Sequence, residues 1–125
     1  MIDHNKNNEP LDLSYLSDMS GGSAEFMIEM LVVFQTQTPL YMDELEQAVL
    51  AKDWKKTAES AHKIKPTFYY VGRPDVRDHM QEMETNAREL QNVDNIANTF
   101  AETKAFVEIL YQQLEDAKRE LEKAI

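Results

Sequence analysis

His62 has the most distinctive chemical surroundings of any residue in this sequence. The window 52–65 around it holds five lysines and only two acidic residues, although the whole chain has a formal net charge of -10. A local excess of positive charge in an acidic protein favours a phosphate group. Neutral imidazole can attack phosphorus near neutral pH and forms a phosphoramidate, which readily passes its phosphoryl group on. Lys65, one helical turn beyond His62, could neutralise the oxygens of the group in transfer.

The residues around His62 are expected to form a helix over 54–71 with one buried face. That face consists of Trp54, Thr57, Ala61, Ile64, Phe68 and Val71. At about 100° per residue, His62 points about 130° away from its centre and is expected to be exposed. An ordinary surface histidine is the alternative. The docking surface expected around it consists of Lys55, Ala58, Ala61, Lys63, Pro66 and Tyr69. Ala58 and Ala61 are small, so a partner's active site could approach the imidazole closely.

Glu84 is expected to face His62 from the next helix. Gly72 ends the histidine helix and Pro74 begins another, and so short a loop makes the two helices an antiparallel hairpin. His62 lies ten residues before Gly72 and Glu84 lies twelve after it, so the two side chains are roughly level. Glu84 could then accept a hydrogen bond from Nδ1 of His62 and leave Nε2 free to react. A fully solvated Glu84 is the alternative.

The elements that must position these residues are all expected to be α-helices. Long stretches are rich in good helix formers, and only three glycines and four prolines interrupt them. The expected helices cover residues 11–19, 23–52 with a kink or break near Pro39, 54–71, 74–90 and 96–124. This order predicts an all-α fold, an antiparallel up-down four-helix bundle with a short extra N-terminal helix and a long C-terminal helix. Residues 1–10 are expected to be a flexible tail and residues 11–125 a single bundle domain.

Two of these helices carry apolar residues at helical spacing. In the helix that follows Gly22 they are Phe26, Met30 and Val33 or Phe34, and beyond Pro39 the pattern resumes with Tyr41, Leu45, Ala48 and Val49. In the last helix the spacings alternate between four and three along Ile96, Phe100, Thr103, Val107, Leu110, Leu114, Ala117, Leu121 and Ala124. We expect this stripe to be bundle core, with a dimerising coiled coil as the alternative.

The composition argues against several classes of function. The acidic net charge disfavours nucleic acid and an anionic membrane surface as partners. With no cysteine there is neither a disulfide framework nor a thiol nucleophile. His4 and His79 lack a companion at i±3 or i±4 that could complete a metal site, so no bound metal is expected. No apolar run approaches the roughly 20 residues of a membrane span, and the start lacks a signal sequence, so a cytoplasmic location is expected.

The segment 61–72, AHKIKPTFYYVG, resembles the signature of histidine-containing phosphotransfer (HPt) domains. That signature is Ala-His-x-Leu-Lys-Gly, followed by a glycine ten residues after the histidine. The resemblance covers about residues 11–115 and also includes Leu11-Asp-Leu, Gly21-Gly22, Glu25-Phe26, the Pro39 region and Asp53-Trp54. It implies a four-helix bundle that carries phosphate between aspartates of receiver domains, which bring the Mg²⁺ and the acidic pocket. By position, it makes His62 the phosphoacceptor and Lys65 the phosphate-stabilising lysine.

Pro66 departs from the family pattern, which usually has glycine at this position. Proline lacks an N–H, and its ring crowds the carbonyl group four residues earlier, which is that of His62. We therefore predict a kink of the helix at the histidine.

The sequence predicts a stand-alone phosphotransfer carrier that shuttles phosphate between receiver domains at His62. It would be no enzyme, would bind no cofactor itself, and would have response-regulator receivers and a hybrid histidine kinase as partners. We expect a monomer. Two alternatives stay open. One is a helical adaptor that binds receivers without being phosphorylated, which Pro66 would suit. The other is a coiled-coil oligomerisation module, or a dimer through the C-terminal helix.

Overall fold

The computed structural model describes residues 2–125, and residue 1 lies outside the described part of the chain. Its elements are the short 3₁₀ helix η1 (His4–Asn8) and the helices α1 (Ser14–Ser20), α2 (Ala24–Leu50), α3 (Trp54–Tyr70), α4 (Pro74–Glu89) and α5 (Val93–Glu122). Residues 2–125 contain no strand. The predicted all-α fold is therefore confirmed. Within the same residues, no helix is long and apolar enough to cross a membrane.

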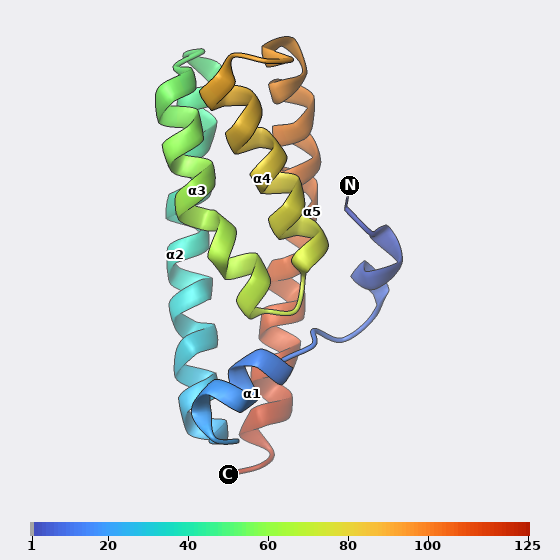
Figure 1. Cartoon of the computed structure of the whole chain (residues 1–125). Coiled ribbons are helices and arrows are strands. Elements are labelled where there is room, and N and C mark those ends of the chain that lie inside the picture. Colours follow the sequence, from blue (N-terminus) through green and yellow to red (C-terminus); the bar gives the residue numbers. More distant parts are fainter. Residues whose placement is uncertain (1) are drawn as a thin grey trace.

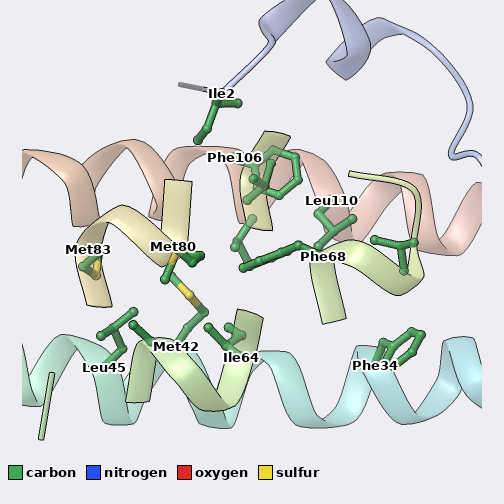
Figure 2. Close-up of a cluster of buried hydrophobic side chains, with 14 of the residues drawn as sticks. Ile2, Phe34, Met42, Leu45, Ile64, Phe68, Met80, Met83, Phe106 and Leu110 are labelled. Carbon is green, nitrogen blue, oxygen red and sulfur yellow. The ribbon is translucent and has the colours of Figure 1, made fainter. Parts of the chain in front are cut away.

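Helices α2 to α5 form a bundle in which each helix runs opposite to the one before it in the chain, and α1 crosses one end (Figure 1). Apolar side chains from all four helices meet between them, as Figure 2 shows for Leu45, Ile64, Met80 and Leu110. These four side chains are completely buried. Burying each one stabilises the fold by about 1.5–3 kcal/mol. The core therefore fixes α3 and α4, which carry the candidate site, against the rest of the bundle.

Local signals in the sequence set where these helices begin and end. The Ser23 hydroxyl accepts a hydrogen bond from the N–H of Phe26 at 3.2 Å, and the Asp53 carboxylate accepts one from the N–H of Lys56 at 3.1 Å. These bonds satisfy N–H groups that the first helical turn leaves unpaired. Gly72 ends α3 with a left-handed backbone, at φ +80°. The hairpin of α3 and α4 follows from this turn.

Helix α2 passes through Pro39 without a break, so the predicted break at this position is wrong. Pro39 is exposed, and a proline on the outside of a helix removes one hydrogen bond on the side that water can reach. The buried stripe of α2 consists of Met27, Leu31, Phe34, Thr38, Met42, Leu45, Ala48 and Val49. Of the expected stripe, Phe34, Leu45, Ala48 and Val49 are buried, whereas Phe26 and Val33 are exposed.

The stripe of α5 lies in the bundle core over most of its length, as expected. Its members from Ile96 to Leu114 are buried. Ala117 and Leu121 are half-buried, and Ala124 is exposed. Core packing therefore uses the stripe as far as Leu114, and the last turns of α5 lie beyond the well-covered part of the bundle.

The N-terminal segment, for which a flexible tail over residues 1–10 is expected, packs against the bundle from Ile2 onward, and residue 1 lies outside the described part. Ile2 is 2% exposed and belongs to the core. The buried Arg73 donates hydrogen bonds to the Asp3 carbonyl and to the Asn7 side chain, at 3.1 and 2.8 Å. The side-chain amide of Gln113 donates to the Glu9 carbonyl at 3.0 Å. Buried donors need acceptors, and this polar segment supplies them.

Gly72 gives a test of the hairpin turn. A Cβ at this position would overlap the backbone of Asp12, whereas Gly22, at φ +82°, has open space around it. Replacement of Gly72 by alanine should lower the free energy of unfolding by about 3 kcal/mol, because backbone strain and overpacking each cost about 1–3 kcal/mol. The matched control Gly22→Ala introduces the backbone strain without the overlap and should lower the free energy of unfolding by about 1 kcal/mol. Urea unfolding measures both, and equal losses would contradict the role of the contact with Asp12.

Candidate functional site

His62 lies on the outer face of α3. Its side chain is 65% exposed, whereas its neighbours Ala61 and Ile64 are completely buried. The predicted buried face of α3 is confirmed, since Thr57, Ala61, Ile64, Phe68 and Val71 are all buried and Trp54 is half-buried. The imidazole ring is therefore open to an approaching protein.

Glu84 of α4 faces His62, as the residue count across the hairpin predicts. The Glu84 side chain is only 3% exposed, and Nδ1 of His62 lies 3.3 Å from each of its two carboxylate oxygens. This distance is at the long end of hydrogen-bonding range. An ionised carboxylate can only accept, so Nδ1 is the donor and carries the proton. The lone pair of the ring is then on Nε2, the nitrogen that does not face the carboxylate.

Two permanent cations hold the Glu84 carboxylate. The Lys65 ammonium lies 2.9 Å from Oε1, and the Arg88 guanidinium lies 2.7 Å from Oε2. Burial raises the pKa of Glu84, but the hydrogen bond and charge of Lys65, together with those of His62, more than compensate and hold this pKa below its usual value of 4.5. Glu84 is therefore ionised at neutral pH.

The Hpt domain family model matches residues 29–124 of the chain. The chain belongs to the Hpt domain family. Comparisons with curated proteins and with solved structures found no match. Hpt domains are phosphotransfer carriers of phosphorelay signalling, not catalytic enzymes, and they interact with receiver domains and kinases of two-component systems. Membership of this family therefore points to histidine phosphotransfer as the chemistry to consider for the exposed His62.

Lys65 of this Hpt domain lies beside Glu84 and not in open solvent. Its side chain is 18% exposed, and its ammonium also donates to Oε1 of Gln81 at 2.6 Å. The sequence reasoning placed Lys65 near the histidine but found neither Gln81 nor Arg88. Glu84 and Arg88 stand at i and i+4 of one helix, the usual spacing of a helical ion pair, so this spacing alone points to Arg88 as a partner of Glu84.

The docking surface expected around His62 is exposed only in part. Lys55, Lys63, Pro66 and Tyr69 are exposed. Ala58 is 2% exposed, so its expected place on the surface is wrong. Ala61 is completely buried, as its place on the predicted buried face requires, and its side chain therefore adds nothing to the docking surface. Helix α3 packs against both α2 and α4, which makes its buried arc wider than the apolar stripe indicates.

Two exposed residues of this surface, Lys63 and Tyr69, contact side chains from other parts of the chain. The Lys63 ammonium lies 3.2 Å from a carboxylate oxygen of Glu44, which offsets part of the positive charge near His62. The Tyr69 ring lies under the Arg77 guanidinium at 5.1 Å and packs edge-on against Tyr15 at 5.0 Å. The aromatic side chain from α1 thereby extends the surface beyond α3.

Pro66 lies inside α3, which remains helical from Trp54 to Tyr70. The ring is exposed, and the carbonyl of His62 has no helical N–H partner because proline lacks one. Figure 1 shows that the ribbon of α3 changes direction along its length.

The other two histidines have local partners. His79 is 5% exposed, and its Nε2 lies 3.1 Å from the Thr99 carbonyl. Nδ1 of His4 lies 3.3 Å from the Asn7 side chain. Among residues 2–125, no group of three or more histidine, cysteine or acidic side chains could hold a metal ion.

The lowered pKa of Glu84 predicts how stability depends on pH. Because the pKa in the folded protein lies below 4.5, the ionised carboxylate stabilises the fold above this pH. That contribution is lost as the pH falls from about 5 through the folded pKa. Glu84→Gln should therefore lose less stability between neutral and acidic pH than the parent protein. Thermal unfolding at a series of pH values measures this, with the exposed Glu82→Gln as control, and parallel curves for parent and Glu84→Gln would contradict it.

Proposed function

We propose that this Hpt domain accepts a phosphoryl group on Nε2 of His62 from the aspartyl phosphate of a receiver domain and passes it to another receiver. The observation that carries the proposal is the pairing of an exposed imidazole with a buried, ionised carboxylate at Nδ1. This pairing favours the tautomer whose free lone pair is on the side open to a partner.

The proposed step conserves atoms and charge. The Nε2 lone pair of His62 attacks phosphorus, an N–P bond forms, and the P–O bond to the receiver aspartate breaks. The bonding electrons leave with the aspartate carboxylate, and Nδ1 keeps its proton. The imidazole ring becomes positively charged, and the Glu84 carboxylate beside Nδ1 stabilises that charge. Attack by an aspartate of the next receiver reverses the same step.

Lys65 and the exposed residues of the docking surface are assigned supporting roles. Lys65 is one turn from His62 and would neutralise the phosphoryl oxygens. Lys55, Lys63, Pro66 and Tyr69 would contact the receiver. We propose that the receiver supplies the Mg²⁺ and that a hybrid histidine kinase feeds the relay. A cytoplasmic location stays a prediction of the sequence.

Phosphate transfer from a charged receiver tests the proposal. The parent protein, incubated with a receiver domain, acetyl phosphate and Mg²⁺, should acquire an acid-labile and base-stable phosphate. His62→Gln should lose this phosphate completely, whereas the control His4→Gln should keep it. No phosphate on the parent protein with receiver binding intact would favour the adaptor instead. A helical dimer that binds no receiver would favour the oligomerisation module.

The role of Glu84 has its own test. Glu84→Ala should slow phosphate acceptance by about 10- to 100-fold, because a hydrogen bond to a charged group contributes about 1.5–3 kcal/mol. Single-turnover transfer from a phosphorylated receiver measures this rate. Glu82→Ala removes an exposed carboxylate from the same helix and should transfer at the parental rate. If Glu84→Ala also keeps the parental rate, Glu84 does not orient the imidazole.

A further inference from the structure

The single ammonium group of Lys65 would have to serve two partners, the Glu84 carboxylate and the phosphoryl group. In the structure it bonds to the Glu84 carboxylate at 2.9 Å and to Gln81 at 2.6 Å, and its side chain is largely buried. In the proposed function the same ammonium turns to the phosphoryl oxygens on His62. A buried carboxylate that loses its positive partners becomes strongly destabilising, because an unpaired charge is costly away from water. Something else must therefore hold Glu84 while Lys65 is engaged with phosphate.

Arg88 is placed to do this. It approaches Glu84 from the same helix, at i+4, and bonds to Oε2, whereas Lys65 comes from α3 and bonds to Oε1. The two cations therefore occupy different oxygens and do not exclude each other. The Arg88–Glu84 distance of 2.7 Å is in the range of a charge-assisted hydrogen bond. The Arg88 side chain is 59% exposed, so water solvates the rest of its guanidinium group.

We propose that Arg88 is a positioning residue for phosphotransfer, the second counter-ion of Glu84 that keeps the carboxylate under Nδ1 of His62 when Lys65 moves to the phosphoryl group. The part that concerns the phosphoryl group rests on the proposed function. The part that concerns the carboxylate does not, because it describes the protein before any phosphate arrives. Arg88 acts through Glu84 and does not contact the phosphoryl group in this proposal.

The charges around the site agree with this division of roles. Before transfer, one carboxylate faces two permanent cations and the His62 ring. After transfer, the ring itself is positive and faces the carboxylate, and the phosphoryl oxygens add negative charge on the opposite side of the ring. Lys65 is then drawn toward the phosphoryl group, and Arg88 and the ring together still satisfy Glu84.

The first test reads the imidazole tautomer of the unphosphorylated protein from ¹⁵N chemical shifts of His62 at neutral pH. Lys65→Gln alone and Arg88→Gln alone should both keep the proton on Nδ1, because one cation still holds Glu84 in each. The double variant should lose this preference. Retention of the Nδ1–H tautomer in a folded double variant would overturn the proposal. The control Arg119→Gln removes an exposed arginine of another i, i+4 pair with glutamate and should change nothing.

The second test measures the lifetime of the phosphorylated protein. Arg88→Gln should shorten it by about tenfold, and Arg88→Lys should restore most of the loss because the counter-ion returns. In a Glu84→Gln background, the buried charge is gone and the same Arg88→Gln change should have no effect. This background also avoids an unpaired buried carboxylate, so folding does not obscure the result.

The outcomes separate the two proposals. A shortened lifetime from Arg88→Gln in the Glu84→Gln background would mean that Arg88 contacts the phosphoryl group directly, which overturns the positioning role. A parent protein that accepts no phosphate would overturn the proposed function, while the tautomer measurement would still decide whether Arg88 holds Glu84.

Discussion

A carboxylate that is almost removed from water must keep its positive partners, and this requirement governs how α3 and α4 lie against each other. Glu84 is 3% exposed and contacts groups from both helices: His62 and Lys65 on α3, and Arg88 on α4. A slip of one helix along the other would separate Glu84 from His62 and Lys65 and leave it only Arg88, a residue of its own helix. The charge that orients the imidazole also fixes the register of the hairpin.

The rest of the bundle serves this register. Gly72 turns the chain within a space that the backbone of Asp12 closes, so the turn has little freedom. Phe68 and Met80, from the two helices of the hairpin, are completely buried in the shared core (Figure 2). A close-packed interior resists small displacements, and a hydrogen bond of 3.3 Å depends on that resistance. The rigid core therefore keeps Glu84 in place beside a histidine that is itself exposed.

The α3–α4 hairpin and the facing pair of His62 and Glu84 could be predicted from the sequence because both depend on local rules. Helical spacing, a glycine stop and a proline start are sufficient to place His62 level with Glu84. The burial of Ala58 depends on two neighbouring helices that cover α3, which no single-helix pattern reports. In α2 the predicted stripe is correct at Phe34 and at Leu45, Ala48 and Val49, and it is wrong at Phe26 and Val33. The predicted break at Pro39 is also wrong, because an exposed proline can be accommodated on the outer side of a long helix.

The contacts of the N-terminal segment could not be predicted in the same way, because they join residues far apart in the chain. Asp3 bonds to Asp75, 72 residues away, and Gln113 bonds to Glu9, 104 residues away. The bundle itself forms from neighbouring helices joined by short turns. Contacts of long sequence separation carry a larger loop-closure entropy and form more slowly. We therefore expect residues 2–9 to dock onto a bundle that has already folded, as the last step of folding and the first region to open in the native state.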